Sequence, residues 1–220
     1  NVQGNISLSP EVRFRVESDR PQYWRVDAYN RYTGTGWIRT GSGGGYGGGN
    51  LATPPGETRT LTQRYTVVDE LGVAPAAWKA RSMSGDAVSA AGVSDEDGFT
   101  VDGSLPPSTN YTVESEVPLA NPSTLRSAGT EYPERITTRY TNVPSSTPDR
   151  LSERTERITA NAENPYDTAR VVEQWLENNR EYSLDIERPE GNIADAFLFE
   201  MDAGYCTYFA TTMVTMLRSQ

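Results

Sequence analysis

The period of the hydrophobic pattern changes partway along this chain, and that change limits the folds it can take. Residues 11–17 alternate charged and apolar side chains with period two, which is typical of a strand with one buried face. Later in the chain, apolar residues such as Ala169, Val172 and Leu176 recur at the spacing of a helix. The sequence therefore predicts a β-rich part followed by an α-rich part.

The β-rich part is expected to hold several short strands separated by Gly and Pro. Besides residues 11–17, the strands are expected at 23–29, 37–40, 61–68, 99–101 and 111–117. Turn chemistry at 30–36 predicts that the first two of these form a hairpin. Residues 41–49 are mainly glycine and lack the Gly-Lys-Ser/Thr of a phosphate loop, so we expect a mobile surface loop there. Short strands of this kind predict an antiparallel sheet or a sandwich.

The α-rich part contains recognisable helix starts. Thr147-Pro148-Asp149 predicts a helix with Thr147 as its N-cap, and Asn164-Pro165 begins a second helix that runs to Asn179. A last helix is expected from Cys206 to Arg218. Its apolar stripe is expected to consist of Ala210, Met213, Val214 and Leu217. We therefore expect an α+β fold, with a β-rich N-terminal subdomain at 1–127 and a helical subdomain at 128–220.

The composition excludes several kinds of site. The chain has one cysteine and no histidine, so these residues form no intrachain disulfide, no His-ligated metal site, no Ser-His-Asp triad and no Cys-His pair. We expect no cofactor-binding residues and no metal site. The net charge of −10 repels phosphate backbones, so nucleic acid is not an expected partner.

Cys206 is the candidate nucleophile. It follows Gly204 and Tyr205 and opens the last predicted helix, where unpaired backbone N–H groups and the helix dipole favour the reactive thiolate. The N–H of Cys206 is also a candidate oxyanion donor, and Gly204 is expected to allow a sharp turn and leave room for substrate. A lone cysteine is more commonly a small core residue, so position alone leaves both interpretations open.

The sequence around Cys206 resembles the core of the transglutaminase-like superfamily, a papain-like group of cysteine acyltransferases and proteases. The resemblance is closest to its membrane-anchored bacterial and archaeal branch. It rests on Gly-Tyr-Cys at 204–206, Phe209-Ala210, Asp-Ala-Phe-Leu-Phe at 195–199 and Met-Val-Thr-Met-Leu-Arg at 213–218. A looser resemblance covers the helix and tyrosine at 169–182 and the aromatic segment at 23–37. The resemblance implies that Cys206 is the catalytic nucleophile.

The same resemblance implies that a sheet after the cysteine helix supplies a His and then an Asp. No residue here matches either of them, so we expect a truncated core that is inactive alone, with the His/Asp lobe of the parent protein as its partner. The other expected partner is a protein or peptide substrate. The resemblance also implies an extracytoplasmic location in a membrane-anchored parent, with membrane contact only through flanking segments.

Other site candidates are weaker. The resemblance implies Tyr182 as a second oxyanion donor, although an ordinary packed tyrosine is the alternative. The carboxylates near the thiol are expected to form a solvated face, because negative charge beside a thiol raises its pKa; they are Asp195, Glu200 and Asp202. Three aromatic residues are expected in the sheet core rather than on a sugar-binding platform; they are Trp24, Tyr29 and Trp37.

Two functions remain open at this point. In the first, the parent enzyme forms a Cys206 thioester from a protein or peptide amide, and an amine or water then resolves it, giving cross-linking, proteolysis or deamidation. In the second, the domain is a non-catalytic extracellular binding or scaffold module. A His and a later Asp in the parent protein would favour the enzyme.

The charge balance leaves a second question open. There are 30 acidic and 20 basic residues, and Lys79 is the only lysine. A GC-rich genome replaces lysine by arginine without any physical cause. A halophilic origin accounts for both the missing lysines and the net charge of −10.

We predict that the fold is stabilised by molar salt. Each close pair of exposed carboxylates costs a few tenths of a kcal/mol, and salt at about 1 M shortens the screening length to about 3 Å. Recovering about 2–3 kcal/mol is a large fraction of a typical stability of roughly 5–15 kcal/mol. The melting temperature should therefore rise between ~0.1 and ~3 M KCl, with NaCl as the control for ion identity. A flat or falling melting temperature would leave the arginine excess to codon usage.

Overall fold

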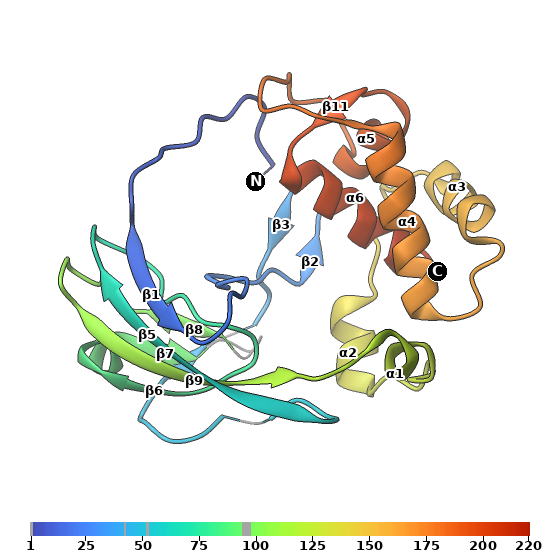
Figure 1. Ribbon diagram of the computed structural model, residues 1–220. Coiled ribbons are helices and arrows are strands. Elements are labelled where there is room, and N and C mark those ends of the chain that lie inside the picture. Colours follow the sequence, from blue (N-terminus) through green and yellow to red (C-terminus); the bar gives the residue numbers. More distant parts are fainter. Residues whose placement is uncertain (1, 42, 52, 94–97) are drawn as a thin grey trace. The chain divides into compact units, whose positions relative to one another are not determined.

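The computed structural model describes residues 2–41, 43–51, 53–93 and 98–220, and it divides into two compact units (Figure 1). The β unit consists of Ser9–Ala28 and Thr40–Ala120. The helical unit consists of Asn1–Leu8, Tyr29–Arg39 and Asn121–Gln220. Antiparallel sheets in the first unit and helices in the second give an α+β fold. The boundary between subdomains at residue 127 stays a prediction, and two segments from the first 39 residues pack with the helices.

The β unit contains a four-stranded antiparallel sheet and a three-stranded one. In spatial order the larger sheet consists of β1 (Phe14–Ser18), β5 (Thr58–Val67), β9 (Asn110–Pro118) and β6 (Ala80–Gly85). The smaller consists of β4 (Gly44–Gly45), β7 (Ala91–Val93) and β8 (Phe99–Val101), and the 3-10 helix η1 (Asp86–Ala90) lies between β6 and β7 in sequence. Their core combines aliphatic and aromatic side chains, with Tyr65 stacked on Tyr111 at 4.8 Å between ring centroids.

The strand expected at 61–68 forms as β5, although it begins three residues earlier and ends at Val67, and its side chains alternate in burial. Leu61, Gln63, Tyr65 and Val67 are buried, while Arg64 and the other intervening side chains are half-buried or exposed. This pattern is what one buried face of a twisted sheet requires. The strand therefore covers the core with its odd-numbered residues, as its sequence predicts.

A buried amide lies within this otherwise apolar face. Gln63 is completely buried; its Nε2 donates to the carbonyl of Leu61 at 2.8 Å and to Ser115 Oγ at 3.1 Å. Its Oε1 accepts from the backbone N–H of Ala77 at 2.8 Å and from the hydroxyl of Tyr65 at 3.3 Å. The amide joins β5, β9 and the segment before β6, and every one of these polar groups would be costly to leave unpaired.

Two expectations for the β-rich half are wrong. The hairpin forms between β2 (Arg31–Tyr32) and β3 (Trp37–Ile38), so its first strand lies inside the segment expected to turn. Residues 23–29 contribute only an isolated bridge, from Arg25 to Ala76. The glycine-rich segment is not simply a surface loop, because it includes β4 and because Tyr46 is buried, with its hydroxyl accepting from the N–H of Met83 at 3.1 Å. Residue 42 of that segment lies outside the described residues.

The helical unit contains six helices within the described residues and two short strand pairs. The helices are α1 (Pro122–Arg126), α2 (Glu134–Tyr140), α3 (Asp149–Thr159), α4 (Pro165–Asn179), α5 (Ile193–Phe199) and α6 (Cys206–Arg218). The strand pairs are the β2–β3 hairpin and the parallel pair β10 (Glu181–Tyr182) and β11 (Ala203–Gly204). The expected bounds of α4 and α6 are confirmed, as is the Asn164 cap, which accepts from the N–H of Asp167 at 2.9 Å.

Two helix details differ from expectation. Thr147 does not cap α3; its hydroxyl instead accepts from Asn192 Nδ2 at 3.0 Å. The expected stripe of α6 is not its buried face, since Ala210 is exposed and the other three residues are half-buried. The buried positions are Tyr208, Thr211, Thr212, Thr215 and Met216.

Two of the three buried threonines of α6, Thr211 and Thr215, have polar partners that its periodicity did not reveal. Thr215 Oγ1 donates to the carbonyl of Thr211 at 2.7 Å, and Thr211 Oγ1 accepts from the indole N–H of Trp37 at 2.9 Å. A hydroxyl that satisfies its hydrogen bonds can be buried at little cost.

Among the described residues, no helix is long and apolar enough to cross a membrane.

We predict that Gln63→Leu lowers the free energy of unfolding of the β unit by about 2–3 kcal/mol, because it leaves the buried N–H of Ala77 without its acceptor. Equilibrium urea unfolding measures this. Gln174→Leu, at an exposed position of α4, is the matched control and should change stability by less than about 0.5 kcal/mol. Equal effects of the two substitutions would contradict the role given to the amide.

Candidate active site

Cys206 lies at the start of α6 with its thiol accessible. It is the first residue of this 13-residue helix and is exposed, which confirms the expected position in the first turn. Tyr205 is the N-cap, in an extended conformation, and its side chain makes no capping hydrogen bond. The first backbone N–H groups of α6 are therefore directed toward the thiol end of the helix, where they and the helix dipole favour negative charge.

The short parallel pair β10–β11 brings Tyr182 to the same place. Tyr182 is aligned with Gly204, and the N–H of Ser183 donates to the carbonyl of Gly204 at 2.9 Å. The Tyr182 side chain is 62% exposed, and its ring stacks on that of Phe209 at 6.4 Å between centroids. The structure thus places Tyr182 beside Gly204, so that both residues singled out in the sequence, Cys206 and Tyr182, lie at the same end of α6.

Gly204 has a role in packing that the sequence did not predict. A Cβ atom at this position would lie 2.7 Å from Cε2 of Phe197 and 2.9 Å from Cβ of Tyr208, and real Cβ atoms do not approach so closely. The glycine is required because α5 and the first turn of α6 pack directly against the backbone here. The structure therefore shows a close-packing role for Gly204, and the room expected there for substrate stays a prediction.

The N-terminal segment is bound to the residues on either side of the thiol. The carbonyl of Gln3 accepts hydrogen bonds from the hydroxyls of Tyr205 at 3.0 Å and Tyr208 at 2.5 Å. Burial raises the pKa of both tyrosines, so both stay protonated donors at neutral pH. The segment is held further along by the N–H of Ile6, which donates to the carbonyl of Leu184 at 3.1 Å. Nothing in the local sequence signals this contact across about 200 residues.

The β2–β3 hairpin caps the start of α5. Asn192 is the N-cap and accepts from the N–H of Asp195 at 3.1 Å. The hydroxyl of Tyr32 accepts from the N–H of Ala194 at 3.0 Å and donates to the carbonyl of Gly34 at 2.6 Å. Burial raises the pKa of Tyr32 to about 12, so the hydroxyl keeps its proton. The N–H groups of Ile193 and Ala194 at the start of α5 are therefore satisfied by Gly34 and Tyr32, about 160 positions earlier.

The expected solvated face is confirmed for Glu200 and Asp202, which are exposed, but it is wrong for Asp195. Asp195 is buried, and its Oδ1 accepts from Nε of Arg150 at 2.8 Å. The same guanidinium donates to Glu200 Oε1 at 2.7 Å, and these hydrogen bonds raise the pKa of Arg150. The pair joins α3 to α5, so Asp195 is structural. Asp202 is exposed, and its carbonyl accepts from the N–H of Glu181 at 2.9 Å.

A second arginine fixes the other end of α5. Nε of Arg180 donates to the carbonyl of Phe197 at 2.8 Å, and one Nη donates to that of Leu198. Its guanidinium also lies 5.6 Å from the centroid of the Trp175 ring. A cation at the C-terminal carbonyls of a helix is favoured by the dipole. Arg150 and Arg180 therefore hold α5 along its length, directly before the turn to Cys206.

The three aromatic residues expected in one core are separated. Trp24 packs in the β unit, edge-on to Tyr65 at 6.0 Å. Trp37 belongs to the helical unit, where Arg218 lies over its ring at 5.0 Å. Tyr29 is exposed. Only Trp24 has the expected role in the sheet core.

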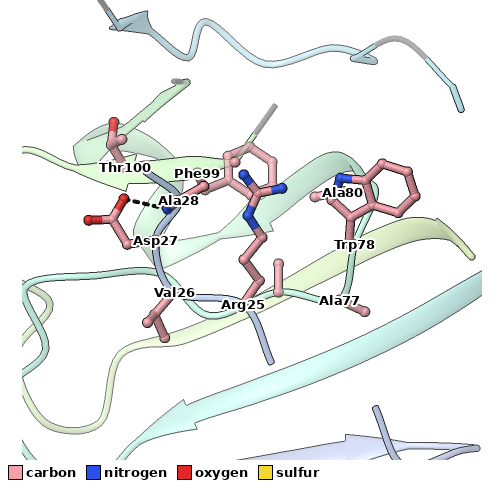
Figure 2. A pocket seen from close by; sticks show the side chains of 11 residues that line it. Arg25, Val26, Asp27, Ala28, Ala77, Trp78, Ala80, Phe99 and Thr100 are labelled. Carbon is pink, nitrogen blue, oxygen red and sulfur yellow. Dashed lines mark hydrogen bonds between the residues drawn. The ribbon is translucent and has the colours of Figure 1, made fainter. Parts of the chain in front are cut away.

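A hollow in the β unit is lined by residues outside the candidate site. Figure 2 shows the side chain of Arg25 extending between Phe99 and Trp78, while the Asp27 carboxylate accepts from the N–H of Ala28 at 2.8 Å. Cys206 is not among the lining residues.

Within the described ranges, no group of three or more His, Cys, Asp or Glu side chains could hold a metal ion.

Two family profiles match successive segments of the chain. The profile of the TgpA N-terminal domain matches residues 2–122, and that of the transglutaminase-like superfamily matches residues 152–220. The chain is 28% identical over 233 residues to the uncharacterized protein YebA of Bacillus subtilis (strain 168). The alignment covers 94% of this chain, which spans only 31% of the length of that curated relative.

Solved structures show the same fold. The periplasmic domain of TgpA from Pseudomonas aeruginosa matches with a TM-score of 0.67 and 18% identity, covering 96% of this chain and 71% of that one. The same domain bound to ethylmercury gives 0.66 and 19%, covering 96% and 73%. Since the TgpA N-terminal domain profile covers more than half of the residues of this chain, the chain belongs to that family. It continues into a transglutaminase-like superfamily core.

Proposed function

We propose that this chain is the front part of a thiol enzyme that acts on protein or peptide amides, with Cys206 as the nucleophile. The observation that supports this most directly is the exposed thiol at the first residue of α6, within the segment that matches the transglutaminase-like core. A helix N-terminus favours the thiolate and supplies unpaired N–H donors.

The proposed reaction begins when the Cys206 thiolate attacks the carbonyl carbon of an amide. A C–S bond forms, the carbonyl oxygen gains negative charge, and the backbone N–H of Cys206 and the hydroxyl of Tyr182 donate to it. The C–N bond then breaks as the leaving amine takes up a proton. The resulting thioester is resolved by an amine, which gives cross-linking, or by water, which gives proteolysis or deamidation.

The proton for the leaving amine has no obvious source within these residues, because they include no histidine. We propose that a further lobe of the parent protein supplies the His and the Asp. The fold similarity to the periplasmic domain of TgpA supports an extracytoplasmic location for this chain. We propose in addition that the parent protein is membrane-anchored.

A second candidate is a non-catalytic extracellular scaffold, which does not need the histidine that these residues lack. The two candidates differ in the parent protein. An enzyme requires an acid that can protonate the leaving amine, whereas a scaffold does not. The reactivity of the thiol and the turnover of the full-length protein therefore decide between them.

We predict that iodoacetamide modifies Cys206 of the 220-residue chain at neutral pH, while this chain shows no amidase or transamidase turnover. Peptide mapping by mass spectrometry and a coupled ammonia assay measure the two quantities. Cys206→Ser is the control for labelling. Turnover by this chain that Cys206→Ala abolishes would show that some other group acts as the acid.

In the full-length protein, Cys206→Ala should lower kcat by at least about 10³-fold, because the covalent step is lost. Tyr182→Phe removes only the hydroxyl and should lower kcat by about 10²-fold with little change in KM, as expected for one oxyanion donor. Tyr23→Phe, at a tyrosine that is 97% exposed, is the matched control. An unchanged kcat for Tyr182→Phe would remove Tyr182 from the oxyanion site, and activity in Cys206→Ala would refute the nucleophile.

A further inference from the structure

Tyr182 and Phe209 form an exposed aromatic surface in the helical unit, which we call the aromatic shelf. Their rings are nearly parallel, with an interplanar angle of 24° and a centroid distance of 6.4 Å. Phe209 is half-buried and packs edge-on against the fully buried Phe197 at 5.0 Å. The core therefore supports the shelf through the contact of Phe209 with Phe197, while Tyr182 remains 62% exposed.

Two independent features of the backbone place the shelf beside the thiol. Phe209 follows Cys206 by three residues in α6, so the two side chains share one face of the helix, about one turn apart. Tyr182 is aligned with Gly204, two residues before Cys206, and neighbouring strands lie about 4.8 Å apart. An extended peptide advances about 3.3 Å per residue, so a substrate whose carbonyl is at Cys206 can reach the shelf with a nearby side chain.

The chemistry of the shelf favours an apolar ligand. The ring of Tyr182 offers its face, and the hydroxyl makes no hydrogen bond within the described part of the chain. Glu181 precedes Tyr182 in β10, and successive side chains of a strand point to opposite faces, so its carboxylate is directed away from the shelf. Aromatic pairs gain from offset stacking beyond the area that they bury.

We propose that the aromatic shelf binds an aromatic or large aliphatic side chain of the acyl donor, next to the amide that Cys206 attacks. This inference rests on the proposed function and adds a substrate class to it. The ring face of Tyr182 selects the side chain, while the oxyanion role proposed for the same residue depends on its hydroxyl. The two roles are separable by substitution because they use different parts of the residue.

The test uses the full-length protein and peptidyl chloromethyl ketones that differ only in one side chain, which is Phe, Leu, Lys or hydrogen. The second-order rate of Cys206 alkylation is measured for each and divided by the rate with chloroacetamide. The Phe and Leu probes should react roughly tenfold faster than the glycine probe. Tyr182→Ala should reduce that ratio to within about twofold, whereas Tyr182→Phe should keep it. Tyr23→Ala is the matched control and should keep the ratio.

The outcomes separate this inference from the function on which it rests. Equal rates for all probes, a faster rate for the Lys probe, or a ratio that survives Tyr182→Ala would overturn the shelf, while labelling of Cys206 would still support the nucleophile. No labelling by chloroacetamide or any probe would overturn both. The melting temperature of each variant shows whether a lost rate ratio comes from a lost fold. If Tyr182→Ala does not fold, Tyr182→Leu replaces it. A rate for the Phe probe that is as high with Tyr182→Leu as with wild type would then overturn the role of the ring face.

Discussion

The close packing of Phe197 fixes where the candidate nucleophile lies. Phe197 is fully buried in α5 and contacts Tyr208 and Phe209 in the first turn of α6, and it leaves no room for a side chain at Gly204. The position of α5 therefore determines the position of Cys206. That short helix of seven residues would not be stable alone, and its stability has to come from tertiary contacts. The hairpin cap at its start, the ion pair of Arg150 and the carbonyl contacts of Arg180 supply them. A substitution in the hairpin can thus disturb the thiol without touching it.

Much of the fold was predictable wherever the determining interactions are local. The Asn164 cap and the Pro that follows it define the start of α4 within one turn, and alternation along β5 is a property of the strand itself. The predictions failed where a distant partner decides. The buried face of α6 includes Thr211, which accepts from the indole of Trp37, and Thr215, whose hydroxyl bonds back to the helix. The glycine-rich segment gains a strand because β7 and the Tyr46 hydrogen bonds order it. Neither partner can be identified from periodicity.

The candidate site, too, could be predicted only where its determining contacts are local in sequence. Cys206 was found because the Gly-Tyr-Cys step and the helix start are adjacent in sequence, and the structure brings Tyr182 to the same end of α6 through β10–β11. Asp195 was misjudged because its partner, Arg150, lies 45 residues earlier, and a carboxylate without a known partner is assumed to be solvated. Gln3 was missed altogether. Its contribution is a backbone carbonyl, which any residue supplies, so no sequence signal marks it.

The arrangement around Cys206 suggests how an acyl-transfer site can be shared between two lobes. The groups that would bind and polarise an amide are held by the fold, because Tyr208 in the first turn of α6 is buried, β10 pairs with β11, and Phe209 of the aromatic shelf packs on Phe197. Rigid donors lower the barrier for attack because they need no reorganisation as charge develops. Collapse of the tetrahedral intermediate still requires a proton at the leaving amine, and without it the thiolate is the better leaving group and is expelled instead. A lobe that carries the nucleophile without the acid would therefore add reversibly to an amide and release it unchanged. Binding the acid-bearing lobe would then commit the intermediate to product, which makes the contact between lobes the step that controls turnover in the proposed mechanism.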